Sequence, residues 1–449
     1  MKIGLEIHIQ LNTKTKVFCG CPTSGNESPN TRTCEICTGQ PGSKPCLNEE
    51  VLKKALKVAL ALQCKINATN IFSRKTYFYP DLSKNYQITQ YELPLAINGK
   101  FQGVKIKRIH IEEDPGALIH KKDYCLVDYN RSGIPLIEVV TDPDLKSPQE
   151  ARTFIRELIT ALEYLDVYDK KSDATLKADL NISTTGARIE IKNVNGLQDI
   201  ERALSYEVER QKKETPKTQE TRGWDAEQKR TFLQRTKETE ADYGYITDPD
   251  LAIIAISKKE IESIRKTIPE LAADKVSRFK EIYSLSEYDA KVLSQNKNLA
   301  HLYENVAKKV NPQIAASWIT RDILKQARFT KKRIEELNIQ PNHLIELLEL
   351  YENKQITDNT AKQVLRELVE KKPFSPKEYV EKHKLSMKSD TKQLETWCQK
   401  AIKENPKAVE EYKNGNEKSL NFLMGSVMKL SNKTANPSEV IKLLKKLLN

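Results

Sequence analysis

Four cysteines near the start of the chain have the spacing of a metal site. Cys19 and Cys21 form a C-x-C pair, and after twelve residues Cys34 and Cys37 form a C-x-x-C pair. Four thiolates at this spacing suit tetrahedral Zn²⁺. Because they fill the coordination shell and leave no position for water, the predicted zinc is structural. The alternative is a group of reduced cysteines without a metal.

Glu6 and His8 have the chemistry of ligands for a harder cation. The apolar run Ile3–Leu11 predicts a strand, and strand side chains alternate, so Glu6, His8 and Gln10 share one face. A carboxylate and an imidazole side by side suit Mg²⁺ or the floor of an active site.

A second acidic group precedes a Pro-Gly turn. Glu112, Glu113 and Asp114 are consecutive, and His110 shares a predicted strand face with Glu112. Carboxylates this close repel one another unless a cation lies between them, and Mg²⁺ prefers such oxygen ligands. A solvated acidic turn is the alternative.

Two later strands also carry polar residues. Leu176–Ser183 places Asp179 and Asn181 on one face, and the next strand places Glu190 and Lys192 together. For a single strand this pattern is typical of a surface salt-bridge ladder. Several such strands in one sheet indicate a lined cavity instead.

Residues 73–91 combine aromatic, amide and cationic side chains. Four tyrosines alternate with Lys75, Lys84 and Gln87 around a turn. Tyrosines offer stacking faces and hydroxyl donors, and lysines suit phosphate. An ordered polar loop is the alternative. Farther on, Asn130 and Arg131 stand directly before a buried strand.

Composition indicates a soluble protein of a reducing compartment. The chain has 449 residues, of which 30% are charged, and no apolar run is long enough to span a bilayer. The first residues enter a strand pattern at once, without the apolar segment of a signal peptide. Four of the eight cysteines have metal spacing and four are scattered, which favours the cytoplasm over a disulfide framework.

The charge distribution favours an anionic partner. The formal net charge is +12, and the last 79 residues carry 17 lysines against nine acidic residues, a net +8. A localised basic module is typical of nucleic-acid binding. A lysine-rich proteome would give a similar overall charge.

The order of the predicted elements favours an α+β fold without the regular alternation of a doubly wound sheet. Predicted strands are Ile3–Leu11, Val104–Glu112, Ile134–Val140, Leu176–Ser183 and Ala187–Ile191, and predicted helices are Glu49–Leu62, Pro148–Leu165 and Asp199–Lys213. After residue 257 the apolar period is helical, in Ile261–Ile268, Asp289–Ser294, Leu299–Lys308, Ile314–Gln326, Lys332–Leu337, Pro341–Asn353 and Thr360–Glu370. We therefore predict a catalytic body at 1–254, a helical domain at 255–384 and a small basic helical tail at 385–449.

The chain closely resembles the GatB family of glutamyl/aspartyl-tRNA amidotransferase subunits along its whole length. The resemblance rests on ordered motifs that include the four cysteines, Gly4–His8, Arg74–Asp81, Tyr86–Ile88, Glu112–Gly116, Leu126–Arg131, Pro135–Glu138, Glu190–Asn195, Gln219–Arg222, Asn405–Val409 and Phe422–Lys429. Where the family has Gly-Ser-Leu-Arg and Tyr-Arg-Tyr, this chain has Ala174-Thr175-Leu176-Lys177 and Tyr243-Gly244-Tyr245, and Gly196 replaces a serine.

The resemblance implies a cradle-shaped catalytic body, a helical domain and a tail that contacts tRNA. It also implies a cytoplasmic ligase that works as a heterotrimer with an amidase (glutaminase) subunit and a small bridging subunit. ATP phosphorylates the side-chain carboxylate of Glu-tRNA(Gln) or Asp-tRNA(Asn), and ammonia from the amidase displaces phosphate to give Gln-tRNA(Gln) or Asn-tRNA(Asn). The chain contains no P-loop sequence, so its carboxylates are the expected Mg²⁺ holders.

The same resemblance assigns roles to individual residues. The expected catalytic residues are Glu6, His8, Glu113, Lys75 and Lys84, with both lysines near the ammonia path. The expected magnesium ligands are Glu6, His8, Glu112, Glu113, Asp179 and Glu190. The expected cofactor-binding residues are Tyr79, Gln87, Asn130, Arg131, Lys192 and Asn193. Because of the departures from the family pattern, a catalytically inactive zinc-containing tRNA-binding adaptor is the alternative function.

Overall fold

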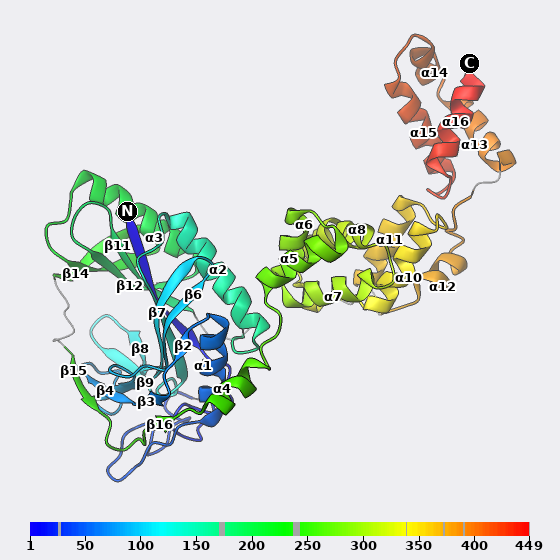
Figure 1. Ribbon diagram of the computed structural model, residues 1–449. Helices are drawn as coiled ribbons and strands as arrows, with labels where there is room; N and C mark the ends of the chain where they lie inside the picture. Colours follow the sequence, from blue (N-terminus) through cyan, green and yellow to red (C-terminus); the bar gives the residue numbers. More distant parts are fainter. Residues whose placement is uncertain are drawn as a thin grey trace. The chain divides into compact units, whose positions relative to one another are not determined.

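A computed structural model describes residues 1–25, 28–169, 176–236, 243–337, 339–370, 373–388 and 391–448 (Figure 1). The chain divides into two compact units, Met1–Leu271 and Ala272–Asn449. The first is mixed α and β and the second is helical, so the predicted α+β class is confirmed. Among the described helices, none combines the length and the apolar character needed to cross a membrane.

The first unit is built on a nine-stranded sheet, in which every neighbouring pair is antiparallel except β12 and β13. Its strands, in spatial order, are β14 (Arg230–Thr236), β13 (Glu220–Asp225), β12 (Ile189–Asn195), β11 (Lys177–Ser183), β1 (Lys2–Gln10), β10 (Pro135–Thr141), β7 (Val104–Glu113), β6 (Ala96–Phe101) and β2 (Lys65–Ile66).

Smaller sheets complete the unit. They are β15-β4-β5, with β4 at Ser73–Thr76, β5 at Tyr86–Thr89 and β15 at Gly244–Thr247; β3-β16, at Thr69–Asn70 and Ile254–Ala255; and the hairpin β8-β9, at Ala117–His120 and Cys125–Asp128.

Helices cover one face of the large sheet because its central strand alternates strictly. In β1, Ile3, Leu5 and Ile7 are almost fully buried and join one apolar core with α1 (Glu49–Ala61), α2 (Pro148–Tyr164) and α3 (Leu197–Lys213). The Ser147 hydroxyl caps α2 by accepting from the Glu150 amide at 3.1 Å, as the sequence predicts. The other face of β1 remains for polar side chains.

Helix α4 (Lys258–Arg265) belongs to the first unit. Ile261 and Ile264 pack against the core of the large sheet, although we expected these residues in the helical domain. The three-part division with boundaries at residues 254 and 384 stays a prediction.

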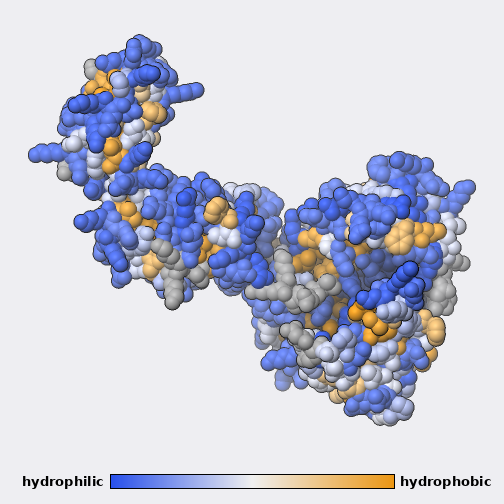
Figure 2. Space-filling view, turned by 180° about the vertical axis from the view of Figure 1, so that it is seen from behind, coloured by the Kyte–Doolittle hydropathy of each residue, from blue (hydrophilic) through white to orange (hydrophobic). Residues whose placement is uncertain are grey.

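The second unit contains helices α5 to α16. Their bounds are α5 Ala272–Tyr283, α6 Glu287–Ser294, α7 Lys297–Ala307, α8 Pro312–Ser317, α9 Leu324–Thr330, α10 Pro341–Glu352, α11 Asp358–Glu370, α12 Pro376–Lys382, α13 Thr391–Glu404, α14 Pro406–Lys413, α15 Lys418–Leu430 and α16 Pro437–Leu448. A π-helical segment, Trp318–Ile323, joins α8 to α9. Figure 2 shows that hydrophilic residues cover most of this unit's visible surface.

Two of our helix predictions need correction. The predicted helix Lys332–Leu337 is only a 3₁₀ turn at Ile334–Glu336, because Lys331 takes a left-handed conformation (φ 55°) that ends α9. The sequence-based prediction also left out α5, whose buried Phe279 packs on Tyr303. The last four helices share a core of their own, built around Leu423, Val427 and Val440.

Candidate functional site

The polar face of the large sheet gathers the acids and histidines of four neighbouring strands. Glu6 on β1 lies opposite Asp179 on β11, and His8 lies opposite Glu138 on β10. Glu138 in turn lies opposite His110 on β7. Residues paired across antiparallel strands share a face, so these side chains form one row across the sheet.

One end of the row is a histidine cluster of His8, His110, Glu112 and Glu138. His8 Nε2 lies 3.4 Å from Glu112 Oε1 and 3.7 Å from Glu138 Oε2. His110 Nε2 lies 2.8 Å from Glu138 Oε2, while its Nδ1 is buried and has no hydrogen-bond partner in the described part of the chain. His8, Glu112 and Glu138 can each direct one ligand atom to a common point.

Mutual attraction keeps the histidine cluster charged despite its burial. Burial alone would lower the pKa of His110, but the charges of Glu138 and Glu112 outweigh it and raise that pKa to about 9. Burial alone would raise the pKa of Glu138, yet His110, His8 and Lys75 hold it well below the usual range. Opposite charges at these distances favour the ionised forms.

The other end of the row is a carboxylate cluster of Glu6, Asp179 and Glu190, whose nearest oxygens all lie within 4.8 Å of one another. Lys192 Nζ lies 2.7 Å from Glu190 Oε1 and 3.1 Å from Asp179 Oδ2. The Asn181 amide donates to Glu6 Oε1 at 3.1 Å. Burial, with the charges of Glu138 and Asp179, raises the pKa of Glu6 to about 7.

An irregularity in the sheet brings Lys192 and Asn193 to Asp179. The β11–β12 register shifts between Ala178 and Leu180, so both residues of β12 lie opposite Asp179. Asn193 adopts a positive φ of 53°, and its amide donates to Asp179 Oδ1 at 2.7 Å. Bulges of this kind commonly redirect side chains beside active sites.

Both clusters fit a hard divalent cation. Mg²⁺ binds oxygen at 2.0–2.1 Å, so two of its ligands lie at most about 4.2 Å apart. The carboxylate cluster is close to that spacing, and its three acids exceed the single Lys192 charge. Imidazole and carboxylate also meet in the histidine cluster, which suits a second ion or a phosphate-bound metal.

The four cysteine sulfurs also converge. They lie within 4.8 Å of one another, and Cys34 and Cys37 are 4.0 Å apart, close to the roughly 3.8 Å between thiolates on one tetrahedral Zn²⁺. None of the eight cysteines forms a disulfide. A hydrogen bond from Cys19, aided by the charge of Lys16, lowers the pKa of Cys37.

A buried lysine stands beside these thiols. Lys16 is fully buried, and its ammonium donates to the carbonyl of Arg32 at 2.8 Å and to Cys37 Sγ at 3.6 Å. No carboxylate of the described residues pairs with Lys16. A buried ammonium needs a counter-charge, and a zinc ion with four thiolates carries about two negative charges that would supply it.

Comparison with known proteins agrees with this arrangement. Residues 1–262 match the family described as the GatB/GatE catalytic domain, and residues 301–448 match the GatB domain. The aspartyl/glutamyl-tRNA(Asn/Gln) amidotransferase subunit of this type from Thermotoga maritima is 42% identical, over 99% of this chain and 98% of its own length. The corresponding proteins from Carboxydothermus hydrogenoformans and Persephonella marina are each 40% identical over 99% of this chain. The chain belongs to the GatB family. The resemblance found in its motifs is therefore confirmed.

The structure separates Glu113 from the other family acids. Neighbouring strand residues point to opposite faces, so Glu112 joins the histidine cluster and Glu113 turns away. Glu113 Oε2 lies 2.7 Å from Lys84 Nζ, and Oε1 accepts from the Ile88 amide at 2.8 Å. Gln87 donates to the Glu113 carbonyl at 2.8 Å. Glu113 as a magnesium ligand stays a prediction.

Lys84 and Glu113 line a cavity of about 210 Å³ that also reaches Cys37 and Arg74. We call it the lateral cavity. A lysine and a glutamate held together in a partly enclosed space give it a polar lining beside the cysteine site.

Other family positions have different surroundings. Lys75 Nζ lies 4.6 Å from the centre of the Tyr243 ring, a cation–π distance. Tyr79 is half exposed. Asn130 holds the cysteine loop by accepting from the Arg32 amide at 2.6 Å. Arg131 donates to the Gly116 carbonyl at 2.6 Å and so fixes the turn after β7.

The sequence-based prediction left out Glu138 and did not assign His110 to the site. The available signal for Glu138 was a single acid within the apolar run Ile134–Val140. Its place became evident only from the pairing of β10 with β1 and β7.

The departures from the family pattern lie around this face. Lys177 pairs across from His8, and Gly244 begins β15. Gly196 precedes α3 with φ 81°, a conformation that favours glycine. Ala174 lies outside the described residues.

We predict that replacing Lys16 by Met, which keeps the length but removes the charge, speeds zinc loss to a chelator by about tenfold or more, the scale found for outer-shell partners of metal ligands. Exposed Lys14, two residues earlier, gives the matched control Lys14→Met. A colorimetric chelator assay on the purified protein measures both rates. Equal rates in the two variants would contradict the role of Lys16.

Proposed function

We propose that this chain is the transamidating subunit of a tRNA-dependent amidotransferase, which acts in the cytoplasm with an amidase subunit and a small bridging subunit. Its substrates are Glu-tRNA(Gln) or Asp-tRNA(Asn), ATP and ammonia. The observation that supports this most directly is full-length family membership combined with two acid clusters on one sheet face.

The proposed reaction has two steps. A side-chain carboxylate oxygen of the attached amino acid attacks the γ-phosphorus of ATP, and ADP leaves. Ammonia then attacks the resulting acyl phosphate, inorganic phosphate leaves, and one proton is released as the amide forms. The first step is needed because a carboxylate oxygen is a poor leaving group until it carries phosphate.

We assign the metal sites by donor chemistry. Glu6, Asp179 and Glu190 would hold one Mg²⁺, and His8, Glu112 and Glu138 are placed to hold a second cation or to contact the phosphates. Bound Mg²⁺ would neutralise charge on the transferring phosphoryl group. Lys192 and Lys75 would add positive charge near the same oxygens, since each already acts on the clustered acids. Cys19, Cys21, Cys34 and Cys37 would hold a structural Zn²⁺.

Ammonia needs a route that excludes water and protons. The lateral cavity, with Lys84 and Glu113, is our candidate for part of that route, in agreement with the family likeness of Lys75 and Lys84. Free ammonia is already nucleophilic, so the second step requires no general base.

The decisive experiment is transamidation by the co-expressed three-subunit complex. We expect conversion of Glu-tRNA(Gln) or Asp-tRNA(Asn) with ATP and glutamine, measured by chromatography of the released amino acid. Failure to convert either tRNA, with the amidase subunit hydrolysing glutamine normally, would contradict the proposal.

Glu138→Gln separates an enzyme from the alternative of an inactive adaptor. The change keeps the shape but removes the charge that His110 and His8 share. We expect transamidation to fall about 10- to 100-fold while tRNA binding is retained. Unchanged turnover would exclude a catalytic role for the histidine cluster.

The basic tail predicts a salt-dependent interaction with tRNA. Replacing the exposed Lys413, Lys418, Lys445 and Lys446 by Gln, or deleting the residues after about 384, should weaken tRNA binding. The slope of log K against log salt should fall by about 0.7–0.9 for each phosphate that no longer meets a lysine. Filter binding at several salt concentrations measures the slope, and an unchanged slope would mean that these lysines are only a solvated surface.

A further inference from the structure

The family motif Gln219–Arg222 has no role in the proposed reaction, yet it borders the carboxylate cluster. Most of it lies on β13, which pairs in parallel with β12 so that Glu190 is opposite Thr221. Strand alternation sends Thr221 to the polar face, and Glu220 and Arg222 to the face that α3 covers.

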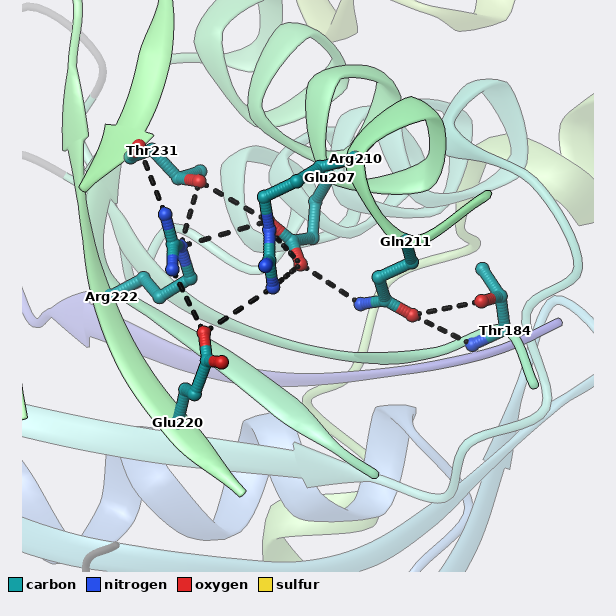
Figure 3. Close-up of polar contacts among 7 residues, drawn as sticks. All are labelled: Thr184, Glu207, Arg210, Gln211, Glu220, Arg222 and Thr231. Atoms are coloured by element: carbon teal, nitrogen blue, oxygen red, sulfur yellow. Dashed lines mark hydrogen bonds and ion pairs between the residues drawn. The ribbon is translucent and has the colours of Figure 1, made fainter. Parts of the chain in front are cut away.

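On the helix side the strand is held by a buried ionic network, which we call the Glu207 clamp (Figure 3). Glu207 on α3 is fully buried and accepts from Arg210 at 2.7 Å and from the Thr231 hydroxyl at 3.1 Å. Arg222 lies 2.8 Å from Glu220, and its Nε donates to Thr231 at 2.9 Å. The clamp therefore ties α3 to both strands of the β13–β14 edge.

The clamp balances its own charge. Two guanidinium groups, Arg210 and Arg222, meet two carboxylates, Glu207 and Glu220. A buried pair is costly to break because the remaining charge is left without a partner. A one-residue slip of β13 would reverse its faces and break these contacts, so the clamp opposes such a slip.

On the polar side Thr221 meets Glu190. Thr221 is 2% exposed, and its hydroxyl lies 3.4 Å from Glu190 Oε2. The other oxygen of Glu190 is already held by Lys192 at 2.7 Å. The β13–β14 register shifts between Thr221 and Arg222, an irregularity of the kind that redirects a side chain.

We propose that Thr221 is a positioning residue that orients Glu190 within the carboxylate cluster, and that the Glu207 clamp keeps Thr221 on that face. Groups that hydrogen-bond a ligating carboxylate typically change metal affinity 10- to 100-fold when removed. The inference rests on the proposed function, because it takes Glu190 as a Mg²⁺ ligand.

The test compares Thr221→Val, which removes only the hydroxyl, with Thr221→Ser, which keeps it. In the three-subunit complex we expect Thr221→Val to raise the Mg²⁺ concentration for half-maximal transamidation about tenfold, and Thr221→Ser to stay within about twofold of wild type. Thr236→Val, at an exposed threonine of β14, is the matched control and should match wild type. A purely structural role would lower the melting temperature without moving the Mg²⁺ requirement.

The outcomes separate this inference from the function itself. An inactive wild-type complex would contradict the proposed function. An active wild-type complex with an unchanged Mg²⁺ requirement in Thr221→Val would overturn the role of Thr221, as would a Thr221→Ser complex that behaves like Thr221→Val. If Thr221→Val does not assemble, Thr221→Ala tests the same hydroxyl.

The clamp has its own variant. Glu207→Gln keeps the shape and removes the charge that Arg210 and Arg222 share. We expect a lower melting temperature together with a higher Mg²⁺ requirement. A lower melting temperature with the wild-type Mg²⁺ requirement would overturn the part assigned to the clamp.

Discussion

The strict alternation of β1 is the constraint on which the rest of the body depends. Its odd-numbered residues, such as Ile7, are buried in the helix-covered core, and its even-numbered residues, such as Glu6 and His8, point to the opposite face. Moving a polar residue into that core would cost several kcal/mol, so the apolar face fixes the register of the neighbouring strands. The same register sets which acids meet across β11, β10 and β7.

Electrostatic balance then decides how the polar face is organised. Its acids are too close to be stable alone, and each group is compensated by a cation from an adjacent strand. His110 compensates Glu138, and Lys192 compensates Asp179 and Glu190. On the helix-covered side the Glu207 clamp follows the same rule with two guanidinium groups. Thus charge pairing between neighbouring strands holds both the candidate site and the edge of its sheet.

Much of the body could be predicted from local patterns. The strands at β1, β7, β10 and β11 and the helices α1 and α2 follow directly from apolar periodicity and capping. The site was harder, because distances between strands are not encoded locally. Glu112 and Glu113 are adjacent in sequence, yet alternation sends one to His8 and the other to Lys84. Glu138 was missed since a single acid in an apolar run carries no signal before its neighbours are known.

The sequence by itself determined the α+β class, the cysteine site, the basic tail and the family, since each is written in residue spacing, composition or ordered motifs. Only the tertiary structure decided the grouping of the acids into two clusters, the joining of Lys16 to Cys37 and the two-sided role of Gln219–Arg222. The physical reason is that charges interact over a few ångströms in space. Strand register and bulges, which arise from contacts far apart in sequence, set those distances.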